Sequence, residues 1–80
     1  MPKPDSIFNF QGVACPYNYV KTKLALEEMA PGQILEVIVD DGEPSRNVLR
    51  SITQDGQTVV NTYTDNDGLV HILIRKTADI

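Results

Sequence analysis

The segment Ile34-Leu35-Glu36-Val37-Ile38-Val39 is the most strand-like stretch of the chain, and it indicates how the rest is arranged. All of its residues except Glu36 are apolar and most are branched at Cβ, a composition that favours β-strands. A nearly unbroken apolar run is typical of a central strand, so we expect this strand inside a sheet, with Glu36 on the face more open to water. Asp40-Asp41-Gly42 then marks a turn.

A strand and a helix are predicted on the N-terminal side of this segment. Ile7-Phe8-Asn9-Phe10 combines aromatic and branched residues and predicts a short strand. After Gly12, residues 16–30 contain no glycine or proline beyond Pro16 and predict a helix, which Pro31-Gly32 ends. Because the crossover is long, the strands on its two sides can lie parallel with a right-handed connection.

A helix and a hairpin are predicted on the C-terminal side. The helix runs from about Glu43 to Gln54, with Pro44 in its first turn and an apolar stripe formed by Val48, Leu49 and Ile52. Two strands, residues 58–64 and 69–76, flank the turn Asp65-Asn66-Asp67-Gly68. Alternation in the last strand puts one set of side chains on the core face and another on the opposite face, namely Val70, Ile72 and Ile74 against His71, Leu73 and Arg75.

The predicted order is β-α-β-α-β-β, which indicates an α+β fold. We expect a two-layer α/β sandwich in which a four-stranded mixed sheet carries both helices on one face, because this arrangement buries all the apolar stripes. The opposite face is left to solvent or to a partner. Residues 1–80 form a single domain, with flexible ends expected at residues 1–5 and 77–80.

Composition and charge exclude several classes of function. The formal net charge of −4 argues against nucleic acid as a direct partner, because phosphate binding needs a basic surface. No apolar run is long enough to span a membrane, and residues 1–5 lack the apolar stretch of a secretory signal. One cysteine forms no internal disulfide, which fits a reducing cytoplasm. One cysteine and one histidine are too few for a zinc site, so we expect no metal and no cofactor.

Cys15 is the side chain with the clearest chemical role. It directly precedes Pro16 at the predicted start of the first helix, where unpaired N–H groups and the helix dipole stabilise an anion. This position lowers the pKa of a thiol and raises the fraction of nucleophilic thiolate. The small residues Gly12-Val13-Ala14 leave the sulfur accessible. The alternative is that Cys15 is a buried small hydrophobic residue.

The first helix has two apolar arcs that cannot both face one core. We expect the first arc to be buried; it consists of Asn18, Thr22, Ala25, Leu26 and Met29, joined by Tyr19. The second is expected to be partly exposed beside Cys15 and to form a docking patch for partner proteins, made of Tyr17, Val20, Lys21 and Leu24. The alternative is that a small domain buries both arcs.

Three further polar residues invite a role. His71 is interpreted as a solvated residue on a strand face rather than as a base or ligand. Asp40 and Asp41 are interpreted as turn residues that cap the second helix, and the alternative is that their charges repel the wrong partner.

The stretch from Gly12 to Leu24, GVACPYNYVKTKL, together with Pro31-Gly32 and Asp40-Asp41, resembles the TusA/SirA/YedF family of small sulfur carriers. The ending Leu73-Ile74-Arg75-Lys76 also resembles it, and the similarity runs in register from about Phe8 to Lys76. The family fold is a two-layer sandwich in the order β-α-β-α-β-β. The resemblance implies that Cys15 carries sulfur as a persulfide and that Pro16 opens its helix.

The resemblance also implies partners. A cysteine desulfurase or another sulfurtransferase supplies the sulfur, and a downstream acceptor protein removes it, so the chain works as a sulfurtransferase-type relay that needs other proteins. Two departures from the family pattern, Asn18 for a second proline and Asn9 for an aspartate, leave the pathway open. The alternative function is a non-catalytic interaction or regulatory module of the same fold.

Overall fold

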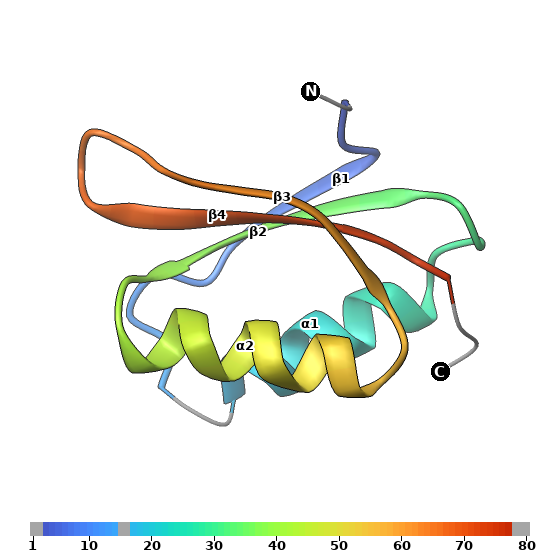
Figure 1. The fold of residues 1–80 in the computed structure, drawn as a ribbon, viewed down its shortest axis with the longest axis horizontal. Helices are drawn as coiled ribbons and strands as arrows, with labels where there is room; N and C mark the ends of the chain where they lie inside the picture. Colours follow the sequence, from blue (N-terminus) through green and yellow to red (C-terminus); the bar gives the residue numbers. More distant parts are fainter. Residues whose placement is uncertain (1–2, 15–16, 78–80) are drawn as a thin grey trace.

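The computed structural model of the chain describes residues 3–14 and 17–77. It consists of a four-stranded sheet with two helices on one face (Figure 1). The predicted element order and the placement of both helices on one face are confirmed. The elements in chain order are β1 (Ser6–Asn9), α1 (Tyr17–Glu27), β2 (Ile34–Asp40), α2 (Glu43–Gln54), β3 (Thr58–Thr64) and β4 (Leu69–Arg75).

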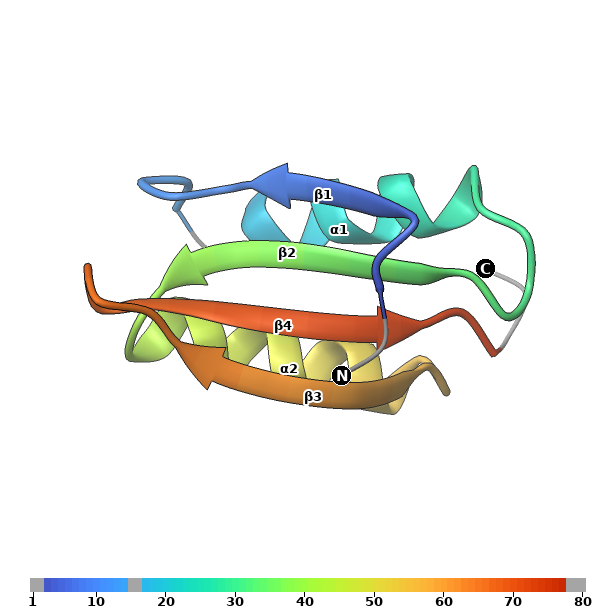
Figure 2. The same cartoon turned by 90° about the horizontal axis from the view of Figure 1, so that it is seen from above.

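The strands lie in the order β1-β2-β4-β3, so β2 and β4 are central and β1 and β3 are edges (Figure 2). β1 and β2 are parallel, as the long crossover through α1 predicts. β4 is antiparallel to both β2 and β3, and the β3–β4 pair is the predicted hairpin. Most side chains of this central strand are buried, on both faces of the sheet, which explains its almost continuous apolar sequence.

The core lies between the sheet and the two helices. The predicted core face of β4 is confirmed, since Val70, Ile72 and Ile74 are buried. They pack in one cluster with buried residues of β2 and of the helices, which include Leu35, Val37, Val39, Leu26, Val48 and Ile52.

The ends of several elements differ from the sequence prediction, and β4, for example, ends at Arg75 rather than at residue 76. β1 begins one residue early, at Ser6, although Phe10 still donates its N–H to the carbonyl of Ile38 at 2.8 Å. α1 ends at Glu27 rather than at residue 30, because Glu28 donates to the carbonyl three residues before it, which tightens the last turn. Lys76 then donates from Nζ to the Met29 carbonyl at 2.6 Å, so a buried lysine satisfies this end of the helix.

In each end segment that was expected to be flexible, the residue next to the domain is hydrogen-bonded to it. Asp5 donates its N–H to the carbonyl of Ile34 at 2.8 Å and accepts the Ile34 N–H on Oδ2 at 2.8 Å. Thr77 donates its N–H to Oε1 of Gln57 at 2.7 Å. These contacts tie the chain on either side of the domain to β2 and to the start of β3.

The sheet face away from the helices is less open than the alternation predicts. Leu73 lies on this face and is fully buried, and Glu36 is only 8% exposed. Glu36 thus marks the sheet face that carries no helix, as expected, but its own side chain is not open to water. Its carboxylate is covered because His71, from the neighbouring strand, lies against it.

Candidate functional site

The loop that leads to Cys15 is anchored to the end of β2. Gly12, with a φ of +79°, donates its N–H to Oδ2 of Asp40 at 2.7 Å. Val13 donates to the carbonyl of Phe10 at 3.0 Å, which turns the chain away from β1. Cys15 itself lies outside the described residues, and so does Pro16. The structure therefore describes the neighbours of these two residues in the sequence, up to Ala14 and from Tyr17 onward.

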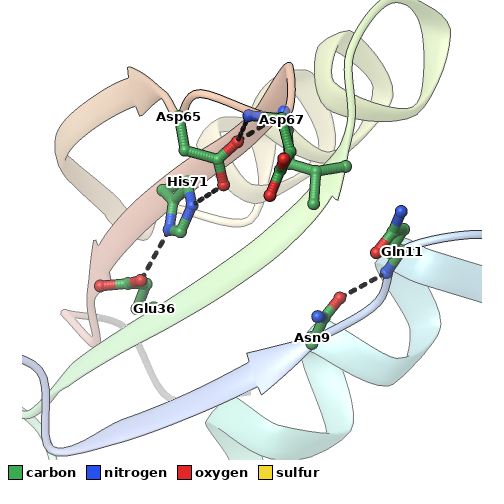
Figure 3. A network of polar contacts seen from close by, with 7 residues as sticks. Asn9, Gln11, Glu36, Asp65, Asp67 and His71 are labelled. Carbon is green, nitrogen blue, oxygen red and sulfur yellow. Dashed lines mark hydrogen bonds and ion pairs between the residues drawn. The ribbon is translucent and has the colours of Figure 1, made fainter.

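Asn9 sits just before this loop. Its Oδ1 accepts the N–H of Gln11 at 2.9 Å, so the side chain closes a short turn at the end of β1 (Figure 3). The replacement of the usual family aspartate thus keeps a side-chain oxygen that holds the turn and removes its charge.

The acidic pair does not cap α2 as we expected. The cap residue of α2 is Gly42, and no described side chain accepts a capping hydrogen bond from the first amides of the helix. Asp41 accepts the N–H of the adjacent Gly42 on Oδ1 at 2.8 Å, which is a turn contact. Asp40 instead reaches Gly12, so the turn interpretation is correct and the capping interpretation is wrong. No local pattern indicates this contact, because the two residues are 28 positions apart in the sequence.

The first amides of α1 already have acceptors. Tyr17 and Asn18 both donate to the carbonyl of Ala14, at 2.8 and 3.2 Å, and Tyr19 donates to Oδ1 of Asn18 at 2.7 Å. The expectation that unpaired N–H groups stabilise the thiolate does not hold for these three amides. The positive end of the helix dipole remains as the contribution of α1 to an anion at this loop.

Asn18 stands where the family resemblance implies a second proline, and the contacts of its side chain give a structural reason for asparagine here. Its side chain is fully buried, and Nδ2 donates to the carbonyl of Pro44 at 3.4 Å. A proline has no side-chain donor and could not make this contact. Thr22 continues the same buried face by donating from Oγ1 to the Asn18 carbonyl at 2.8 Å. Asn18 therefore joins the start of α1 to the start of α2.

The two arcs of α1 are separated as predicted. Asn18, Thr22 and Leu26 are fully buried. Tyr17 is 64% exposed, Val20 43% and Leu24 55%. The alternative in which the domain buries both arcs is therefore wrong, and the docking patch is accessible.

A groove of about 340 Å³ continues the docking patch toward the sheet edge. Phe8 and Phe10 of the β1 segment stack with ring centroids 5.8 Å apart. Across from them α1 contributes Lys21, Leu24 and Ala25, and Glu28, directly after the helix, completes the lining. The sequence pattern placed both phenylalanines on one face of a strand, but it did not indicate that this face would line a groove beside α1.

His71 lies in a polar cluster on the opposite sheet face, between two carboxylates (Figure 3). Its Nδ1 is 2.8 Å from Oε2 of Glu36 and its Nε2 is 2.6 Å from Oδ2 of Asp65. The ring of Tyr63 stacks on it at a centroid distance of 4.4 Å. Only 12% of the His71 side chain is exposed. The interpretation of His71 as a solvated strand residue is therefore wrong.

The charges of this cluster support one another. Burial of the imidazole opposes its charged form, but hydrogen bonds to Glu36 and Asp65 outweigh burial and raise the pKa of His71. The hydrogen bond from His71, together with the N–H of Leu69, lowers the pKa of Asp65. Because each ring nitrogen of His71 contacts a different carboxylate, the charged imidazole forms ion pairs on both sides and is held in place. Within residues 3–14 and 17–77, no group of three or more histidine, cysteine, aspartate or glutamate side chains is placed to hold a metal ion.

Comparison with known proteins agrees with this architecture. A candidate sulfur carrier protein of Archaeoglobus fulgidus is 38% identical over 72 residues, which cover 90% of this chain and 82% of that protein. The candidate sulfur carrier protein YrkI of Bacillus subtilis is 34% identical over 74 residues, which cover 92% of this chain and 97% of YrkI. The crystal structure of a SirA-like protein from Desulfitobacterium hafniense has the same fold, with a TM-score of 0.80 at 20% identity over 91% of this chain and 99% of that one.

Two further findings bear on the class of the protein. No helix in the described part of the chain is long and apolar enough to cross a membrane. The family model described as sulfurtransferase TusA matches residues 7–76, which include the motif around Cys15 and every helix and all but the first residue of the strands. The chain belongs to the TusA family of sulfurtransferases and sulfur carriers.

Proposed function

We propose that this protein carries sulfur as a persulfide on Cys15, receiving it from one protein and passing it to another. The observation that carries the proposal is the family match over residues 7–76, within which Cys15 is the single cysteine of the chain. A lone cysteine suits a carrier, because a second thiol in reach would attack the persulfide, form a disulfide and release sulfide.

The transfer step is a thiolate attack on sulfur. The Cys15 thiolate attacks the outer sulfur of a persulfide on the donor, and a new sulfur–sulfur bond forms at Cys15. The sulfur–sulfur bond of the donor breaks, and the donor cysteine leaves as a thiolate. The proton stays on the transferred sulfur, so no oxidant or reductant is consumed. The acceptor repeats the same step on Cys15.

The surroundings of the motif support this chemistry in two ways. Gly12 is held by Asp40, so the loop before Cys15 is attached to a central strand of the sheet. α1 begins directly after this loop, and its dipole favours negative charge there. Because Tyr17, Asn18 and Tyr19 have bonded N–H groups, we expect a modest lowering of the thiol pKa rather than a large one.

We further propose that donor and acceptor dock on α1 beside the motif. Tyr17, Val20 and Leu24 are exposed apolar side chains on one arc, and Lys21 adds a positive charge among them. Tyrosine and other large apolar residues supply much of the binding energy of protein interfaces. A cysteine desulfurase or another sulfurtransferase is the proposed donor, and the proposed setting is the reducing cytoplasm, where a thiol persists.

Intact mass spectrometry tests the proposal. After incubation with a cysteine desulfurase, its cofactor and cysteine, we expect the protein to gain the mass of one sulfur atom, and reduction with a thiol to remove it. Cys15→Ser must show no gain. If the wild-type protein acquires no sulfur from any desulfurase or persulfide donor while it stays folded, the carrier role is wrong and the interaction module is the better description.

A further inference from the structure

β1 and α1 lie together along one edge of the molecule, which we call the β1/α1 margin (Figure 2). β1 is an edge strand with no charge or proline between Ser6 and Asn9, and Ile7 and Phe8 on it are exposed. The other edge is protected, because β3 has a register irregularity between Val59 and Asn61, and bulges discourage pairing with another chain. The apolar surface of the β1 margin continues onto α1 through the groove.

The charges on α1 run against its own dipole. Lys21 lies in its second turn and Lys23 just past its middle, whereas Glu27 is its last residue and Glu28 follows directly. A helix is stabilised by acidic residues near its start and basic residues near its end, and α1 has neither. Lys21 and Glu28 also form no ion pair with another described residue. The order of these charges therefore does not suit the dipole of α1 itself.

A second α1 running in the opposite direction would complement this order. Lys21 and Glu28 line the same groove, and Leu24 and Ala25 lie midway between them in sequence. A two-fold axis perpendicular to the sheet near this midpoint brings Lys21 of each copy to Glu28 of the other. The exposed Leu24 then packs in the centre, Val20 lies just outside the ion pairs, and the two antiparallel helix dipoles attract each other.

We infer that the β1/α1 margin is the interface of a two-fold symmetric dimer of this chain. The charges select the antiparallel arrangement, because a parallel one would place lysine on lysine and glutamate on glutamate. The exposed apolar residues supply the centre of the interface, as in other homodimers. Since this surface includes Val20, Lys21 and Leu24, the dimer and a docked sulfur partner exclude each other.

Sedimentation velocity over micromolar to millimolar concentrations tests the inference. We expect wild type to shift from monomer to dimer as concentration rises. Lys21→Glu and Glu28→Lys should each weaken the dimer by about tenfold, because each turns two attractive contacts into repulsive ones. The double variant Lys21→Glu/Glu28→Lys should restore it. A mixture of the two single variants should form heterodimers more tightly than either variant forms homodimers.

Matched controls on α2 separate contact from net charge. Arg46→Glu and Glu43→Lys change the charge of the chain by the same amounts at an exposed pair on α2. We expect these two variants to dimerise like wild type, and their mixture to gain nothing. A wild-type protein that stays monomeric at millimolar concentration overturns the inference. A dimer that responds equally to the α1 and α2 variants also overturns it, because the α1 margin is then not the interface.

Discussion

The pair of carboxylates around His71 should make the stability of the fold depend on pH in a specific way. The perturbation that isolates this effect is His71→Gln, which removes the titratable ring and keeps a side-chain amide able to donate to one carboxylate. His71 is the single histidine of the chain, so no other imidazole contributes to the result.

The size of the effect follows from the contacts of the ring. His71 donates to Glu36 at 2.8 Å, and the two side chains are only 12% and 11% exposed. A hydrogen bond to a charged group contributes about 1.5–3 kcal/mol, and glutamine replaces part of it. We therefore expect His71→Gln to lower the free energy of unfolding by about 2 kcal/mol near pH 6. For a domain of this size that corresponds to a decrease in Tm of roughly 8–16 °C.

The pH dependence has a definite sign. The pKa of His71 is raised in the folded state, so its contribution is complete below the unfolded pKa of about 6.5 and is lost as pH rises through the folded pKa. The pKa of Asp65 is lowered, so its contribution is complete above about pH 4 and is lost on further acidification. The cluster therefore stabilises the fold most between about pH 4 and 6.5.

Urea denaturation of both proteins from pH 5 to 9 measures this difference. A Cys15→Ser background removes the thiol, so that only the imidazole is tested within this pH range. We expect the stability gap between wild type and His71→Gln to be widest at the acidic end and to shrink as pH rises. A gap that is constant or grows with pH would refute the reasoning. Proton NMR of the single imidazole must independently give a pKa above the ordinary value of about 6.5.

Three further changes test the loop and α1. Asp40→Ala should lower the free energy of unfolding by about 1–2 kcal/mol in urea denaturation, because the Gly12 N–H loses a charged acceptor, whereas Asp41→Ala should cost less because that side chain bonds only to its neighbour. Gly12→Ala should cost about 1–2 kcal/mol for its positive φ alone, since nothing lies within 4 Å of the added Cβ; an unchanged midpoint would contradict this account. Leu24→Ser should leave stability within about 0.5 kcal/mol and slow sulfur transfer, whereas Leu26→Ser should cost more than about 2 kcal/mol; equal losses of stability would show that the exposed arc is structural.

Most of the architecture was predictable because each element has its own local signal. Pro31-Gly32 and Asp65-Asn66-Asp67-Gly68 mark the ends of segments whose apolar periods differ, and a long crossover permits only a few topologies. The exposed arc of α1 was predictable from a helical wheel for the same reason. The early end of α1 was not, because the switch at Glu28 to a bond three residues back depends on tertiary contacts such as Lys76 with Met29.

The polar contacts around the candidate site were not predictable, because they depend on strand register. Alternation put His71 and Glu36 on one face, but only the pairing of Ile38 with His71 brings the two side chains together. A shift by one residue would have moved His71 to the core face. The Asp40–Gly12 contact likewise depends on β1 and β2 being neighbours, which the sequence predicted only as a topology.

The polar cluster and the cysteine loop meet at one end of the sheet. Asp65 holds His71 with Oδ2 and accepts the N–H of Leu69 with Oδ1 at 3.1 Å. Leu69 pairs with Asp40 across the β2–β4 ladder, and Asp40 holds Gly12. The contacts that lock His71 thus also fix the strand ends from which the loop before Cys15 is suspended. Asp65, Leu69 and Asp40 therefore connect the cluster around His71 to the loop before Cys15 along this end of the sheet.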